Sequence, residues 1–132
     1  MDNRLAAASP LTILNVNDED TIRYVLSRML KSEGYSVIEA VNGQEGLRLA
    51  QNGPALILLD VQLPDISGYR VCEALKADPA TAAIPVLMIS ANFVQPADQA
   101  AGLQSGAAAY LTHPVSASDL SEAIERLLSS PS

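Results

Sequence analysis

Two acidic residues and one hydroxyl residue stand where apolar stretches of this 132-residue chain end. Asp60 closes ALILLD, Asp18 follows LTILNV within NDED, and Ser90 closes PVLMIS. Carboxylates that lie side by side repel each other unless a proton or a cation intervenes. Mg²⁺ would suit such a pair, because it binds one or two carboxylates and completes its shell with carbonyl oxygens and water. An aspartate beside such an ion can act as the nucleophile in phosphoryl transfer, with a hydroxyl nearby to hold a phosphoryl oxygen.

The elements that would bring these residues together alternate along the chain. Short apolar runs rich in β-branched residues predict strands, and apolar residues at three- and four-residue spacing predict helices. Nearly continuous apolar strands separated by helices indicate an α/β fold, a doubly wound five-stranded parallel sheet with five helices on its two faces. The predicted strands cover residues 11–16, 36–40, 55–60, 85–90 and 108–112, and the predicted helices cover residues 21–33, 44–51, 68–77, 96–105 and 118–128.

Right-handed crossovers leave few strand orders open for such a sheet, and one of them is 2-1-3-4-5, the flavodoxin-like arrangement. In this order, ligands bind beyond the carboxyl ends of the first and third strands, where the direction of the chain connections changes. Asp18 follows the first strand and Asp60 ends the third. We therefore expect both carboxylates to project into the same crevice.

Composition limits the class of protein. The length and a hydrophobic content of 48% fit one domain, which we expect over residues 11–129, after a flexible N-terminal segment at 1–10 and before a tail at 130–132. Fifteen acidic and eight basic residues give a net charge of −7, which argues against a nucleic-acid partner, because binding to phosphates depends on clustered Lys and Arg.

Cysteine content and hydropathy indicate the compartment. The single cysteine, Cys72, lies in a helical apolar pattern and is expected to be a packed thiol in a reducing environment. No stretch has the length and apolar character of a membrane span or of a signal peptide. We therefore expect a cytoplasmic protein without a membrane partner.

Four short motifs resemble those of the response regulator receiver domain, a family of two-component signal transduction. LNVNDED resembles the acidic pair after the family's first strand, with Asn17 in the first position and Asp18 in the second. DVQLPDISG resembles the phosphoacceptor motif, with Asp60 as the acceptor. SA at 90–91 resembles the hydroxyl residue and its small neighbour, and YLTHPV at 110–115 resembles the segment in which an aromatic residue precedes a lysine and a proline. Each motif is weak alone, but the four in order form a specific signal over about residues 11–129.

The resemblance implies a phosphorelay role and a metal site. A histidine kinase or phosphotransfer protein would donate a phosphoryl group to Asp60, forming an aspartyl phosphate, with Mg²⁺ or Mn²⁺ as the cofactor. Asp18 and Asp60 would bind the metal through their carboxylates, Gln62 through its backbone carbonyl, and Asn17 through a water molecule. The protein would then be a signalling phosphoprotein and not an enzyme. It would have at most slow self-dephosphorylation.

The resemblance also implies a switch. Ser90 and the backbone of Ala91 would hold phosphoryl oxygens; Ser90 would move inward, and Tyr110 would rotate toward the interior. The surface of the fourth helix (96–105), the fifth strand and the fifth helix would then change and bind an output partner protein. Formation of a homodimer on phosphorylation is left open, as is the choice between a stand-alone regulator and a receiver taken from a larger protein.

Two residues depart from the family pattern. Asn17 replaces a carboxylate and brings no charge, so weaker Mg²⁺ binding is expected. His113 stands where the family has a phosphoryl-binding lysine, and histidine is shorter and only partly protonated near neutral pH. His113 either contacts the phosphoryl group and makes signalling depend on pH, or packs as a neutral side chain against Pro114. The peptide bond between His113 and Pro114 is a candidate cis bond.

Other interpretations are weighed against the receiver. A pseudo-receiver would bind a partner without phosphorylation; Asn17 and His113 favour it, and the presence of Asp18, Asp60 and Ser90 counts against it. A metal-dependent phosphohydrolase would need a general acid two residues after its nucleophile, where Gln62 cannot donate a proton. A flavodoxin is disfavoured because the acidic loop after the first strand would repel a cofactor phosphate.

Simpler structural roles are open for the acidic residues. The simpler interpretation of Asp18 and Asp60 is that they cap the helices that follow; it could hold for Asp18, but it explains the whole constellation poorly. Asp65, in LPDISG, is expected to be a turn or helix cap and not a metal ligand.

Overall fold

Five parallel strands form the centre of the protein. The computed structural model describes residues 11–90, 96–112 and 114–129, without the side chains of residues 96–99. The sheet has the order β2-β1-β3-β4-β5, as the sequence predicted. β3 and β4 are buried at every position, which explains why their sequences are continuously apolar. The strands are β1 (Thr12–Val16), β2 (Ser36–Ala40), β3 (Leu56–Asp60), β4 (Val86–Ser90) and β5 (Ala109–Thr112).

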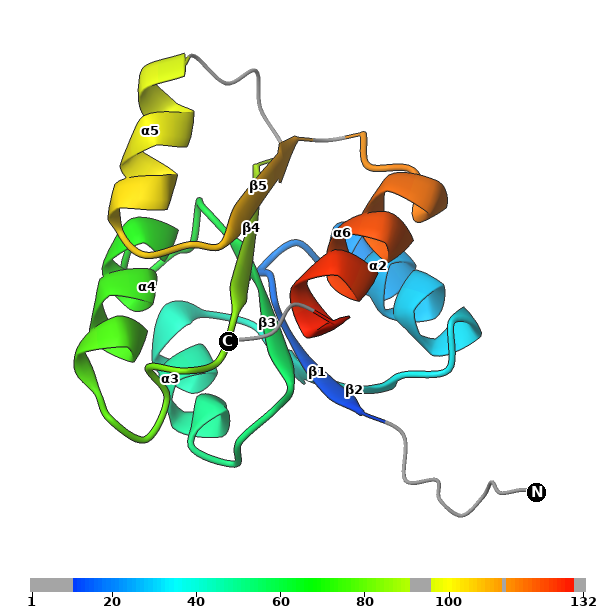
Figure 1. Cartoon of the computed structure of the whole chain (residues 1–132), viewed down its shortest axis with the longest axis horizontal. Helices are drawn as coiled ribbons and strands as arrows, with labels where there is room; N and C mark the ends of the chain where they lie inside the picture. Colours follow the sequence, from blue (N-terminus) through cyan, green and yellow to red (C-terminus); the bar gives the residue numbers. More distant parts are fainter. Residues whose placement is uncertain (1–10, 91–95, 113, 130–132) are drawn as a thin grey trace.

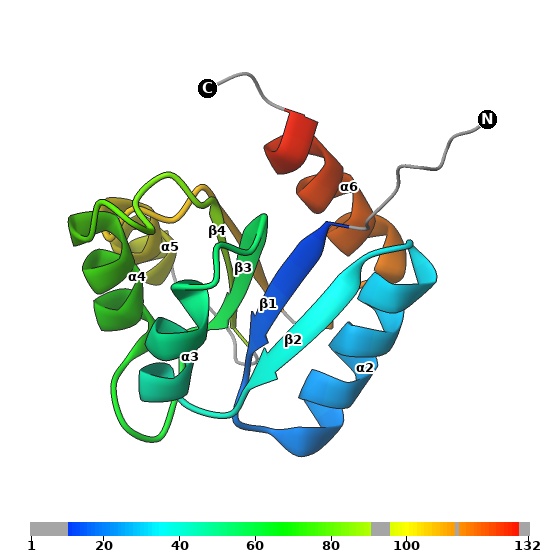
Figure 2. The ribbon, with the colours of Figure 1, turned by 90° about the horizontal axis from the view of Figure 1, so that it is seen from below.

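Helices cover both faces of the sheet (Figure 1). Two of them lie on one face and three on the other, and the view from below in Figure 2 shows the same two layers around the twisted sheet. Each element of this chain lies within one residue of its predicted bounds. The first face carries α2 (Asp20–Ser32) and α6 (Ala117–Ser129), and the second carries α3 (Gly43–Ala50), α4 (Gly68–Ala77) and α5 (Pro96–Gln104).

The hydrophobic core is divided in two by the sheet. Successive residues of a strand point to opposite faces, so neighbouring strand residues enter different cores. Leu58 packs with Leu26 of α2 and Leu120 of α6. Leu59 packs on the other side, with Val71 and other residues of α4. This double burial holds the carboxyl ends of the strands in a rigid frame.

The helices begin at polar caps. Glu19 is the N-cap of α2, and its side chain accepts hydrogen bonds from the backbone N–H groups of Thr21 and Ile22. Ser67 is the N-cap of α4. Neither Asp18 nor Asp60 caps the following helix, so this simpler interpretation of the two residues is wrong.

Two further expectations can be compared with the structure. Cys72 is buried in α4, as predicted, and its burial raises the pKa of the thiol. Within the described part of the chain, no helix is both long and apolar enough to cross a membrane. The segments predicted to be a flexible start (1–10) and a tail (130–132) lie outside the described residues.

Candidate functional site

Asp60 occupies the last position of β3, and only 8% of its surface is exposed. Burial raises the pKa of its carboxyl from 3.8 to about 6, and the negative charge of Asp18 acts in the same direction. The backbone N–H of Gln62, 3.4 Å from Asp60 Oδ1, acts in the opposite direction. Asp60 is therefore a carboxylate whose charge is incompletely balanced by the protein, which is an environment that favours a bound cation.

Asp18 lies in the turn that follows β1, and its side chain is exposed. β1 and β3 are neighbours in the sheet, with Val16 aligned with Leu59. Both strands therefore end at the same edge, and the charge of Asp18 is felt at Asp60. The structure thus brings together the two carboxylates that the sequence predicted to share a crevice.

Asn17 is nearly buried and is held from several directions. Its backbone N–H donates to the carbonyl of Ala40 at 3.0 Å, and its own carbonyl accepts from Arg23 Nη1 at 2.9 Å. Its side-chain Oδ1 accepts from the backbone N–H of Glu19 at 2.9 Å. Sequence reasoning missed this structural role. The spacing of an Asn two residues before the N–H that donates to its side chain, which is typical of an Asx turn, was the available signal.

The loop after β3 packs closely on Asp60. The Gly68 N–H donates to the carbonyl of Val61 at 2.7 Å, and a Cβ atom on Gly68 would overlap the backbone oxygen of Asp60. Gln62 lies in this loop and is exposed. Its carbonyl was the predicted third protein ligand of a metal, and its position next to the end of β3 fits that prediction.

Asp65 caps a helix, but not the one that its own loop enters. Its Oδ1 accepts from the backbone N–H of Gly43, and its Oδ2 accepts from that of Gln44, both at 2.8 Å. These hydrogen bonds, that from Gln44 foremost, lower the pKa of the carboxyl. Asp65 therefore ties the loop after β3 to the N-terminus of α3, and both of its oxygens are used in doing so.

Ser90 and Tyr110 lie on adjacent strands. Ser90 is the last residue of β4 and is 6% exposed, one position beyond the residue aligned with Asp60. Tyr110 of β5 is aligned with Met88 and is half-buried. The Tyr110 ring lies against Gly102 of α5, where an added Cβ would be 2.6 Å from Tyr110 Cδ2.

Several predicted site residues fall outside the described part of the chain. Ala91 and His113 are among them, and so is the peptide bond between His113 and Pro114. Their assigned roles stay predictions.

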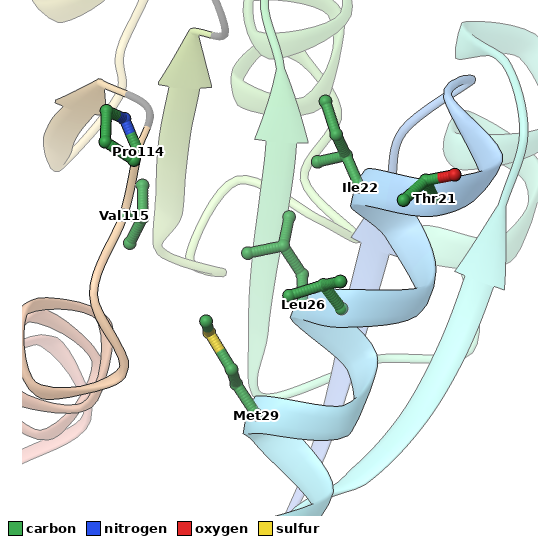
Figure 3. A pocket seen from close by; sticks show the side chains of 7 residues that line it. Thr21, Ile22, Leu26, Met29, Pro114 and Val115 are labelled. Carbon is green, nitrogen blue, oxygen red and sulfur yellow. The ribbon is translucent and has the colours of Figure 1, made fainter.

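A largely apolar groove opens beside α2. Figure 3 shows Pro114 and Val115 facing Ile22, Leu26 and Met29 across it. The groove has a volume of about 210 Å³ and is also lined by Thr21 and Val25. It lies between α2 and the segment that leads into α6.

The donor set at the strand ends fits a hard divalent cation. No group of three or more His, Cys, Asp or Glu side chains that could hold a metal occurs within the described residues. Mg²⁺ does not need one, since it usually keeps several waters and accepts carbonyl oxygen in addition to one or two carboxylates. The incompletely balanced charge of Asp60 beside Asp18 is the structural observation that supports this fit.

Comparison with known proteins identifies the family. The family model of the response regulator receiver domain matches residues 13–125. The chain belongs to this family. This chain is therefore a receiver domain. Receiver domains are signalling domains of two-component systems and not classical enzymes.

Individual relatives agree with this. The chain is 41% identical over 117 residues to the DNA-binding regulator RpaA of a Synechocystis strain, covering 88% of this chain and 48% of RpaA. It is 37% identical to the protein PilH of Pseudomonas aeruginosa, covering 88% of this chain and 96% of PilH. The chain thus spans about half the length of the first relative and nearly all of the second.

Solved structures share the fold. A response regulator from Chloroflexus aurantiacus superposes with a TM-score of 0.88 at 33% identity, covering 92% of this chain and all of that chain. The receiver domain of a sensor histidine kinase from Pseudomonas aeruginosa superposes with a TM-score of 0.85 at 29% identity, covering 92% of this chain and all of that chain. That structure has a magnesium ion coordinated in its active-site cleft.

Proposed function

We propose that this receiver domain accepts a phosphoryl group on Asp60 from the phosphohistidine of a histidine kinase or a phosphotransfer protein. The observation that carries the proposal is the buried carboxyl of Asp60, which has a pKa of about 6 and lies at the same sheet edge as Asp18. A carboxylate oxygen of Asp60 forms a bond to phosphorus while the bond from phosphorus to the donor nitrogen breaks. The product is an aspartyl phosphate, which water hydrolyses slowly.

The metal site of the proposal consists of oxygen ligands from the turn after β1, from the last residue of β3 and from the loop that follows β3. Asp18 and Asp60 bind Mg²⁺ or Mn²⁺ through their carboxylates, and Gln62 binds through its backbone carbonyl. When bound, the cation neutralises charge on the carboxylates and on the phosphoryl oxygens. Support comes from the donor set and from the magnesium ion in the related Pseudomonas structure. Because Asn17 is neutral and its Oδ1 already accepts a hydrogen bond from Glu19, it contributes at most a water-mediated contact.

The proposed switch uses residues on the neighbouring strands. The Ser90 hydroxyl and the backbone N–H of Ala91 bind phosphoryl oxygens, together with His113. The movement of Ser90 changes the packing of Tyr110, whose ring contacts α5 through Gly102. The surface of α5, β5 and α6 then recognises an output partner protein. We place the protein in the cytoplasm. Its receiver domain consists of about residues 11–129.

Intact mass spectrometry tests the proposal. The wild type and Asp60→Ala are incubated with acetyl phosphate and Mg²⁺, with Asp119→Ala, an exposed residue in the first turn of α6, as the matched control. The wild type and the control should gain the mass of one phosphoryl group, and Asp60→Ala should gain none. Excess chelator should abolish the gain.

Failure would be informative. Folded wild-type protein that gains no mass, either from acetyl phosphate or from a phosphorylated phosphotransfer protein, would contradict the proposal and favour a pseudo-receiver that binds its partner without phosphorylation. Equal phosphorylation of Asp60→Ala would show that another residue is the acceptor.

A further inference from the structure

A buried polar residue interrupts the apolar face of β1. Asn15 has 0% exposed surface, although Ile13 of the same strand and Leu58 of β3, which enter the same core, are aliphatic. Its Nδ2 donates to the backbone oxygen of Arg23 at 3.1 Å and to Ser27 Oγ at 3.0 Å. Its Oδ1 is buried without a hydrogen-bond partner in the structure. A buried acceptor without a partner destabilises the fold, whereas the two hydrogen bonds donated by Nδ2 link β1 to α2, which an aliphatic residue could not do.

The hydrogen bonds continue from Asn15 through α2 to β2. Ser27 Oγ donates to Glu39 Oε2 at 2.6 Å. The other oxygen of that carboxylate, Oε1, lies 3.5 Å from Arg23 Nε. The carboxylate of Glu39 therefore joins a serine and an arginine that are one helical turn apart on α2.

Arg23 connects this hydrogen-bond network to the turn after β1. Its Nη1 donates to the carbonyl of Asn17 at 2.9 Å, and its Nη2 donates to Asp20 Oδ1 at 2.6 Å. The Arg23 side chain is 13% exposed, whereas that of its partner Asp20 is 88% exposed. The guanidinium therefore lies largely inside the structure, against the backbone of the residue that precedes Asp18.

We propose that Arg23 is a positioning residue for the metal site: by holding the carbonyl of Asn17, it sets the place from which Asp18 presents its carboxylate. This inference rests on the proposed function, because it concerns the metal that Asp18 would bind. Arg23 itself touches neither the metal nor the phosphoryl group. Its five N–H donors in a fixed plane allow it to bond to Asn17, Asp20 and Glu39 at once, which a lysine cannot do in the same geometry.

The geometry explains why the position of Asp18 matters. Mg²⁺ demands a nearly ideal octahedral shell, so a ligand displaced by a fraction of an ångström binds less well. Loss of a group that orients a metal ligand typically weakens metal affinity by about 10–100-fold. Asn17 and Glu19 flank Asp18 and are hydrogen-bonded to each other. The backbone on which Asp18 sits is thus held on both sides, and Arg23 supplies the contact from the helix.

The test measures the Mg²⁺ dissociation constant by calorimetry for the wild type, Arg23→Met and Arg23→Lys. Arg28→Met is the matched control, since Arg28 lies on the same helix but is exposed and contacts the Tyr24 ring. We expect Arg23→Met to weaken binding about tenfold, Arg23→Lys to restore only part of the loss, and the control to stay within about twofold of the wild type.

A double-mutant cycle separates positioning from general support of the fold. In an Asp18→Asn background the carboxylate that depends on Arg23 is gone, so Arg23→Met should weaken the remaining binding much less. Amide hydrogen exchange without metal gives a second measurement: the N–H groups of residues 17–19 should exchange faster in Arg23→Met and not in Arg28→Met.

The outcomes are distinguishable. The inference would be overturned if Arg23→Met bound Mg²⁺ as tightly as the wild type, or if it weakened Mg²⁺ binding by the same factor with and without the Asp18 carboxylate. Either result would leave the proposed function intact. Absence of Mg²⁺ binding to the wild type itself would count against the proposed function and would overturn the inference with it.

Discussion

Gly68, at the start of α4, lies directly against the backbone carbonyl of Asp60, at the end of β3. A Cβ atom there would overlap that oxygen and crowd the Cα of Val61. Backbone atoms cannot rotate away as the end of a flexible side chain can. The close approach therefore requires glycine, and it fixes the loop that carries Gln62 and Asp65 relative to Asp60.

Gly68→Ala should therefore damage both stability and the site. Overpacking typically lowers the free energy of unfolding by about 1–3 kcal/mol. We expect a loss in this range, measured by urea unfolding monitored by circular dichroism. Phosphorylation by acetyl phosphate should slow in parallel, because the end of β3 must shift. Arg70→Ala, at an exposed position in the same helix, should change neither quantity appreciably. A fully active and equally stable Gly68→Ala would show that the loop can relax.

Asp60→Asn should stabilise the metal-free protein at neutral pH. The pKa of Asp60 is higher in the folded protein, about 6, than its ordinary value of 3.8. The ionised carboxylate is thus disfavoured by folding, and the penalty grows as the pH rises from about 4 to 6 and is constant above. The difference between these two pKa values corresponds to about 3 kcal/mol in the free energy of unfolding.

The measurement for Asp60→Asn is urea unfolding from pH 4 to pH 7.5 without divalent metal. The advantage of the variant should be largest above pH 6 and should disappear toward pH 4. Saturating Mg²⁺ should reduce it, because metal binding stabilises the wild type more than the variant, which has lost one carboxylate ligand. Glu73→Gln, at an exposed position of α4, serves as the control and should show no such pH-dependent gain. A variant that is less stable than the wild type at pH 7 would contradict the expected cost of the charge.

Asp65→Asn should lower the urea midpoint, because one of the two N–H groups at the start of α3 loses its acceptor. The hydrogen bonds from Gln44 and Gly43 lower the pKa of Asp65 in the folded protein. The stabilisation is therefore complete above the ordinary pKa of 3.8 and is lost as the pH falls below it. Urea midpoints of wild type and variant should differ at pH 7 and converge at acidic pH. Equal midpoints at pH 7 would show that the contact across the loops contributes nothing.

Gly102→Ala should disturb the packing of Tyr110. Alanine in a helix is normally about 1 kcal/mol more favourable than glycine. Here the new methyl group would meet the Tyr110 ring and come within 3.2 Å of Met88 Sδ. We therefore expect a net loss of stability in urea unfolding, together with a change in tyrosine fluorescence, which no tryptophan obscures in this chain.

A comparison in two backgrounds tests the role of the ring. In Tyr110→Ala, the same Gly102→Ala substitution should become stabilising, because the ring is gone and the remaining close contact is with the flexible end of the Met88 side chain, which can move aside. Ala100→Gly, at an exposed position of α5, should cost about 1 kcal/mol and calibrate the propensity effect in this helix. A stabilising Gly102→Ala in the wild-type background would mean that the ring does not hold the position found here.

Local sequence patterns predicted most of the fold. Apolar patterns predicted the helices and strands that the structure describes, and their alternation predicted the parallel sheet and left few strand orders open, among them the observed one. The positions of Asp18 and Asp60 followed from the same patterns, because parallel strands place their carboxyl ends at one edge. Asp65 was correctly expected to be a cap, but the helix that it caps precedes it by more than 20 residues in the chain, and local spacing holds no information about that partner.

What the sequence by itself determined was therefore the identity of the elements, the topology of the sheet and the edge at which the acidic residues meet, because these follow from repeats of a few residues. Only the tertiary structure decided which side chains hold that edge in place. LTILNV was interpreted as an apolar strand, yet its Asn15 is buried among polar partners from α2. Arg23 and Gly68 act on the site through backbone carbonyls. Such contacts form between elements that are brought together by folding, and their distances depend on the packing of the whole domain.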